Sequence, residues 1–114
     1  MKLLICILTL IAFSTAGFAQ EETEAYVFRI KVAASRTPLP EGAKVFKDFP
    51  EAEGMLFPDG YYRYFVGKFE TAHRATLQLS AVKDKGYKDA YVVCIHQGRL
   101  LTVDEALTEI YEDR

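Results

Sequence analysis

Residues 61–69 read YYRYFVGKF, and the alternation within this segment decides the fold that the sequence predicts. Successive side chains of a β-strand point to opposite faces, so this segment presents two different surfaces. One face is apolar and aromatic, with Tyr62, Tyr64 and Val66. The other combines a cation with aromatic rings and a glycine: Tyr61, Arg63, Phe65 and Gly67.

The flanking residues predict a hairpin before this strand and a helix after it. Pro58-Asp59-Gly60 is a strong turn signal, and residues 55–57 can form the preceding short strand. Thr71 is a suitable N-cap, and small and apolar residues follow at helical spacing until Gly86 provides a stop.

Further elements can be placed on both sides of this unit. Residues 26–34 alternate as a strand, with Phe28, Ile30 and Val32 on one face and Arg29 and Lys31 on the other. Prolines flank a short helix over residues 41–49, and residues 90–96 form an apolar strand. Residues 100–101 could pair back briefly, and a capping-box pattern at residues 102–105 opens a last helix over 103–113.

This order of strands and helices predicts an α+β fold. The pattern βαββαβ forms a two-layer sandwich of the RNP or ferredoxin-like kind, in which two helices cover one face of a four-stranded sheet. The C-terminal helix is an addition to that core. The second face of the sheet is then expected to be open.

The first residues predict export. Residues 1–19 combine one positive charge, an apolar run and small residues before Ala19, as a secretory signal peptide does. A buried N-terminal helix is the alternative, but the chain turns polar at Gln20. We expect cleavage after Ala19, a leader over 20–25, a domain over 26–96 and a C-terminal turn and helix over 97–114. The processed protein would be periplasmic and would have no membrane span.

The net charge indicates which partners the protein can bind, and the cysteine content indicates whether it has a disulfide. Processing removes only Lys2 among the charged residues, which changes the formal charge from −2 to −3. A negative protein is a poor binder of nucleic acid, so we expect no nucleic-acid partner. Cys94 is the one cysteine outside the signal peptide, and its apolar surroundings predict a buried side chain rather than a disulfide or a nucleophile.

The sequence shows no recognisable catalytic or metal-binding pattern. His73 and His96 lack the spacing of a metal site, and neither Ser35 nor Ser80 lies in a nucleophile motif. Three carboxylates at residues 51, 53 and 59 could suggest glycoside hydrolysis, but solvation near a turn explains them better. We therefore expect a non-catalytic protein without a cofactor or metal.

The candidate binding site is the sheet face away from the helices. Its side chains are cationic and aromatic: Arg29, Lys31, Tyr61, Arg63 and Phe65. Aromatic rings pack against the C–H faces of sugars, and arginine binds carboxylates in bidentate fashion.

Residues 62–71, the spaced alanine and leucine of the following helix, Gly86-Tyr87 and the strand at residues 90–93 together resemble the second half of the SPOR (sporulation-related) repeat. Residues 28–34 are similar to its first strand. The resemblance covers roughly residues 25–96 and implies a βαββαβ domain. It also implies that the sheet face binds peptidoglycan glycan strands lacking stem peptides, whose muramic acid carboxylates suit a cationic surface.

The resemblance extends to single residues. Arg63 and Gly67 match an arginine and a glycine of the family pattern, whereas Lys31 replaces a ligand-contacting glutamine and Phe65 a polar or basic residue. A secreted protein-interaction module that uses the same face, with a cell-wall enzyme or another protein as partner, is the alternative.

Overall fold

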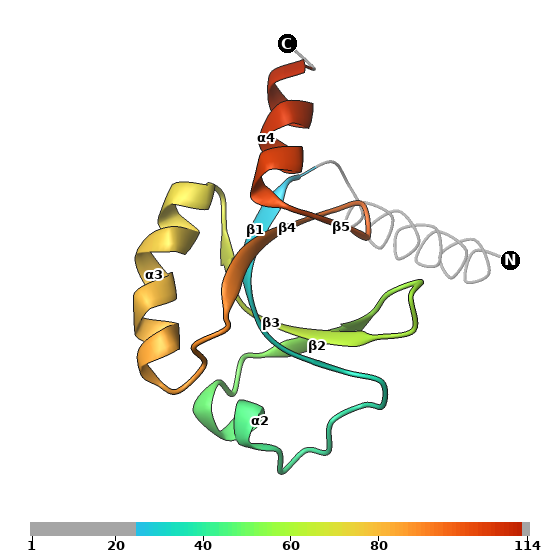
Figure 1. Ribbon diagram of the computed structural model, residues 1–114, viewed down its shortest axis with the longest axis vertical. Coiled ribbons are helices and arrows are strands. Elements are labelled where there is room, and N and C mark those ends of the chain that lie inside the picture. The colour runs from blue at the N-terminus through green and yellow to red at the C-terminus, as the bar shows by residue number, and fades with distance from the viewer. Residues whose placement is uncertain (1–24, 113–114) are drawn as a thin grey trace, which may run out of the picture.

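The computed structural model describes residues 25–112, which form an α+β fold (Figure 1). The elements follow one another along the chain as β1 (Val27–Ser35), α2 (Lys44–Asp48), β2 (Glu53–Leu56), β3 (Tyr62–Phe69), α3 (Ala72–Asp84), β4 (Tyr91–His96), β5 (Arg99–Leu101) and α4 (Val103–Glu112). All the predicted elements are present, and most boundaries shift by one or two residues. The short helix α2 is the exception, because it starts three residues later than expected.

Within residues 25–112 the strands form one antiparallel sheet in the order β2-β3-β1-β4-β5. The expectation of four strands is wrong, since β5 adds a fifth. It pairs Leu101 with Cys94 and Arg99 with His96 after a tight turn at Gln97-Gly98, where both residues have positive φ. Residues 100–101 had suggested only a brief return, but the turn places three residues in register.

Two irregularities curl the sheet. Between Phe28 and Ile30 the register with β3 shifts so that Gly67 and Lys68 together face Arg29. Gly67 has φ +74°, a conformation that favours glycine, and a Cβ atom built there would lie 2.3 Å from the Phe69 ring. A second shift lies between Lys31 and Ala33. Bulges of this kind increase local twist, and the sheet bends strongly around a concave side (Figure 1).

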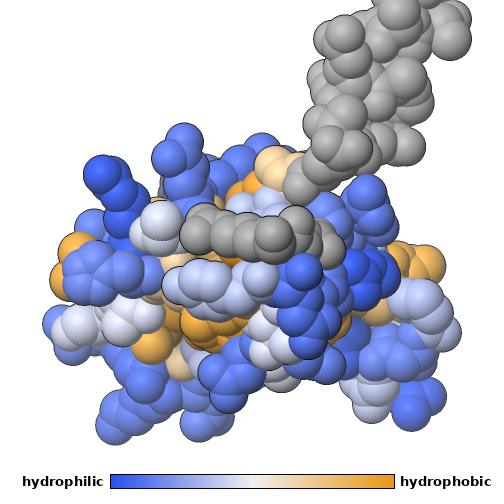
Figure 2. Space-filling view, turned by 90° about the horizontal axis from the view of Figure 1, so that it is seen from above, coloured by the Kyte–Doolittle hydropathy of each residue, from blue (hydrophilic) through white to orange (hydrophobic). Residues whose placement is uncertain are grey.

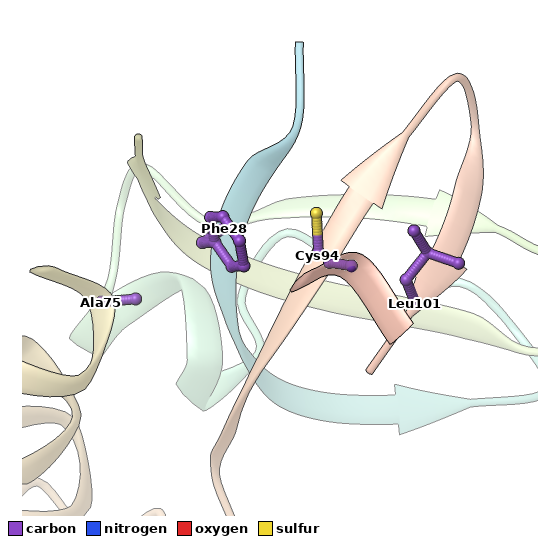
Figure 3. Close-up of a cluster of buried hydrophobic side chains, with 5 residues drawn as sticks. Phe28, Ala75, Cys94 and Leu101 are labelled. Carbon is purple, nitrogen blue, oxygen red and sulfur yellow. The ribbon is translucent and has the colours of Figure 1, made fainter. Parts of the chain in front are cut away.

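The helices pack on the convex side of the sheet. Phe28 and Cys94 contact Ala75 of α3 and Ala106 of α4, with Leu101 of β5 completing this buried cluster (Figure 3). A second cluster beside it joins Ile30 and Val66 of the sheet to Phe49, Val82 and Ala90. Alternation along β1 and β3 therefore predicts the helix-facing side chains correctly.

The two longer helices begin with the predicted caps. The Thr71 hydroxyl accepts a hydrogen bond from the Arg74 backbone N–H at 3.1 Å. At α4, the Glu105 backbone N–H donates to the Thr102 hydroxyl at 3.0 Å, and the Thr102 backbone N–H donates to the Glu105 carboxylate at 2.8 Å. This reciprocal pair is a capping box, and it fixes where the last helix starts.

The expected signal peptide, the expected cleavage site after Ala19 and nearly all of the expected leader lie outside the described residues. Among residues 25–112, no helix is both long enough and apolar enough to cross a membrane. Figure 2 views the molecule from the side on which α4 lies in Figure 1. Hydrophilic residues dominate this view, and apolar residues show in smaller areas between them.

Candidate functional site

The five predicted site residues share the concave side of the sheet. Arg29 lies opposite Val93 of β4, and Lys31 lies opposite both Tyr91 of β4 and Phe65 of β3. Arg63 is two residues from Phe65 on the same strand, so it shares this face. The Arg63 guanidinium lies 5.7 Å from the centre of the Tyr61 ring, which places Tyr61 beside it.

The concave side is not bare, which corrects the expectation of an open face. Phe65 has no exposed surface, and Arg29 is 6% exposed. Phe65 packs with Phe57 and Val93 in a third buried cluster, against which Met55, Ile95 and Leu100 are partly buried. The curled sheet and the segment after β2 thus enclose an apolar core on this side, so Phe65 and Arg29 cannot serve as a free docking surface in this conformation.

Arg29 connects three strands of the curled sheet next to this apolar core. Its Nε donates to the Gly67 carbonyl at 2.7 Å, and its Nη1 donates to the Glu53 carboxylate at 2.8 Å. Its guanidinium also lies 5.7 Å from the centre of the Phe65 ring. The hydrogen bond from Arg29 lowers the pKa of Glu53, although burial opposes that effect. Arg29 therefore has a structural role, connecting β1 to the bulge in β3 and to β2.

Two cations on the concave side are stacked on tyrosines. The Lys31 Nζ lies 5.1 Å from the centre of the Tyr91 ring, and the Arg36 guanidinium lies 5.0 Å from that of Tyr61. Arg36 Nε also donates to the Tyr61 hydroxyl at 3.3 Å. Neither Lys31 nor Arg36 forms an ion pair within residues 25–112.

Arg63 differs from these two cations because a carboxylate already holds it. Its two Nη atoms donate to the two Asp59 oxygens at 3.1 and 2.8 Å, a bidentate pair across the β2–β3 turn. Asp59 raises the pKa of the Arg63 guanidinium, and the Tyr91 hydroxyl adds a smaller effect in the same direction. Arg63 is thus already paired with Asp59 and lies beside the Tyr61 ring.

We call this group of partly or fully exposed residues the cationic rim: Lys31, Arg36, Tyr61, Arg63 and Tyr91. Tyr91 is 47% exposed, and the Arg63 side chain is 20% exposed. Lys31 and Arg36 can each accept a carboxylate without breaking an existing ion pair, while the tyrosines offer ring surface to a sugar. The rim can therefore bind an anionic ligand.

Arg36 and Tyr91 belong to the rim although neither was a predicted site residue. Both parities of residues 90–95 are apolar, so alternation alone leaves the facing of Tyr91 undecided; its pairing with Lys31 settles it. Arg36 follows the end of β1, where the strand pattern stops, and reaches the site only because Tyr61 lies near it in space.

Other reactive side chains are engaged elsewhere. His96 is buried against Tyr26, with ring centres 3.8 Å apart, and its Nδ1 lies 3.3 Å from the Ala25 carbonyl oxygen. Cys94 is fully buried, and burial raises the pKa of its thiol to about 11. In the described part of the chain, no three histidine, cysteine or carboxylate side chains gather as a metal site requires.

No protein-family model matches this chain, and comparisons with curated proteins and with solved structures found no significant match.

Proposed function

We propose that this protein is an exported, non-catalytic module that binds peptidoglycan through the cationic rim. The ligand we assign is a glycan strand without stem peptides, which carries a free carboxylate on each muramic acid sugar. The periplasm is the expected location, with residues 1–19 removed as a signal peptide.

The observation that carries the proposal is the pair of unmatched cations stacked on tyrosines. Lys31 and Arg36 lack a carboxylate partner within residues 25–112, although acidic residues outnumber basic ones in the whole chain. Tyr91 and Tyr61 hold these cations in place. A repeating ligand with alternating ring surfaces and carboxylates matches that arrangement.

Buried residues below the rim hold the strands from which the rim residues project. Phe65 and Arg29 fix the curvature of β1 and β3, from which Lys31 and Arg63 project. In this proposal their role is to position the rim, and ligand contact passes to the rim residues themselves: Lys31, Arg36, Tyr61, Arg63 and Tyr91. The antiparallel sheet with helices on its convex side is an α+β fold, as the sequence predicts, with a fifth strand added.

A protein partner is the second candidate, and one observation favours it. Arginine and tyrosine are enriched at protein interfaces, and the rim consists of these residues and one lysine. Its partner would present an acidic surface to Lys31 and Arg36, such as that of a cell-wall enzyme.

Sedimentation with insoluble sacculi tests the first candidate. The purified protein is pelleted with sacculi before and after an amidase has removed the stem peptides. We expect retention to rise after stripping. The affinity for stripped sacculi should fall at least about tenfold, the equivalent of about 1.4 kcal/mol, when Lys31→Met and Arg36→Met are combined.

Lys47→Met is the matched control, because Lys47 is an exposed lysine on α2, which packs at the convex side. It should leave retention unchanged. If retention is absent from stripped sacculi, or if the control and the double variant lose it equally, the glycan proposal is wrong. Binding to an acidic protein that depends on Lys31 would then support the second candidate.

A further inference from the structure

A cleft of about 360 Å³ lies on the convex side of the sheet, away from the cationic rim. It separates α3 from the segment that follows α2. The apolar part of its lining comes from the sheet and both walls: Ile30, Phe49, Val66, Phe69 and Val82. Its volume falls within the range of about 300–1,000 Å³ that is usual for small-molecule sites.

Contacts made by the lining residues Phe49 and Lys85 hold one wall of this cleft in place. Phe49 packs against the Tyr87 ring with centres 5.2 Å apart, and the Lys85 ammonium lies 4.8 Å from the Phe49 ring centre. Tyr87 donates to the Asp48 carboxylate at 2.7 Å, and Lys85 donates to the Asp48 carbonyl at 3.1 Å. The cleft is therefore formed before any ligand arrives, which lowers the entropic cost of binding.

Small residues keep the cleft open. Ala81 lines it from α3, and Gly67 lines it from β3 at the bulge. Gly67 cannot easily be replaced, because an added Cβ would collide with the Phe69 ring. The same glycine is held from the concave side by Arg29, through the hydrogen bond to its carbonyl.

The polar lining of the cleft carries opposite charges. Glu51 and Lys85 both line it, yet they form no ion pair with each other, and within residues 25–112 neither forms one with another side chain. Gln78 also lines the cleft and has no hydrogen bond from its amide in the described region. The Lys85 ammonium keeps one hydrogen bond, to the Asp48 carbonyl, and Glu51 and Gln78 are exposed. An apolar lining beside this ammonium, a carboxylate and an amide is complementary to a small dipolar molecule with an apolar body.

We infer that the cleft binds a free α-amino acid with an apolar side chain. The side chain would lie against the apolar lining, which includes Phe49, Phe69 and Val82. The ligand ammonium would pair with Glu51, and its carboxylate would pair with Lys85. This site is separate from the proposed glycan surface, and neither depends on the other.

Amide chemical shifts measured during titration test this inference with defined probes. L-leucine should cause saturable shifts at Gly67, Ala81 and Val82. N-acetyl-leucine lacks the ammonium, leucinamide lacks the carboxylate, and glycine lacks the apolar body. Each should bind at least about tenfold more weakly.

Two variants complete the test. Glu51→Gln should remove the preference for leucine over N-acetyl-leucine, and Lys85→Met should remove the preference over leucinamide. Lys83→Met is the control, because it removes a positive charge from the last turn of α3 and Lys83 does not line the cleft. It should leave binding unchanged. The inference is overturned if leucine at millimolar concentration gives no saturable shift. It is also overturned if all probes bind equally or if the two cleft variants bind like the Lys83 control.

Discussion

Replacing Phe65 by alanine distinguishes a buried concave side from an exposed one. The Phe65 side chain has no exposed surface, and its ring meets the Phe57 ring edge-on with centres 6.0 Å apart. Truncating a buried phenylalanine costs about 3–5 kcal/mol through lost burial and the remaining cavity. A domain of this size has a total stability of about 5–10 kcal/mol, so Phe65→Ala should remove roughly half of it.

Urea unfolding followed by far-UV circular dichroism and tyrosine fluorescence measures this loss, since the chain has no tryptophan. Phe65→Leu keeps most of the volume and should cost about 1 kcal/mol. Leu77→Ala is the control, because Leu77 is 63% exposed on α3 and its loss should change stability by about 0.5 kcal/mol or less. If Phe65→Ala costs no more than Leu77→Ala, the ring is not buried and the curled core is wrong.

Three further predictions concern the bulge, the Arg29–Glu53 pair and the thiol. Gly67→Ala should destabilise the protein by about 1–3 kcal/mol in the same unfolding assay, because φ is +74° and the Phe69 ring blocks a Cβ. Gly42→Ala is the control and should be nearly neutral, since Gly42 has open space around it. Equal effects of the two changes would contradict the bulge geometry. Glu53→Gln should cost about 1 kcal/mol at neutral pH, since half of the Glu53 side chain is exposed. Arg29 lowers the pKa of Glu53 in the folded state, so this stabilisation is present above the unfolded pKa and disappears as pH falls through the lowered value. Unfolding curves of wild type and variant should therefore converge in acid, and a constant difference would refute the pair. Cys94, whose thiol pKa is raised to about 11 by burial, should react with a disulfide reagent only at the rate of unfolding, as followed by mass spectrometry in increasing urea. Rapid labelling of the native protein at Cys94 would show that the thiol is accessible.

Local patterns predict most of the fold. Alternation in residues 26–34 and 61–69 gives the faces of β1 and β3 correctly, because one of those faces must meet the helices. Thr71 and Thr102 mark the starts of α3 and α4 through hydrogen bonds made within a few residues. These features depend on interactions between residues that are close in the sequence, so sequence patterns predict them.

The errors arise where distant parts of the chain meet. Alternation predicts that Arg29, Lys31, Arg63 and Phe65 share a face, but it does not reveal that the sheet curls over Phe65. That burial depends on the bulge at Gly67 and on the positions of Phe57 and Leu100, which only the assembled sheet defines. The charge of Arg29 concealed its structural role, since buried arginines are rare without a partner.

Soluble peptide-free glycan fragments, titrated into the isotope-labelled protein, test the central claim most directly. The claim is that Lys31, Tyr61 and Tyr91 form a binding surface above a buried apolar core. We predict saturable chemical-shift changes at these three residues and little change along α3. Shifts confined to α3, or none while stripped sacculi still retain the protein, would contradict a binding site on the concave side.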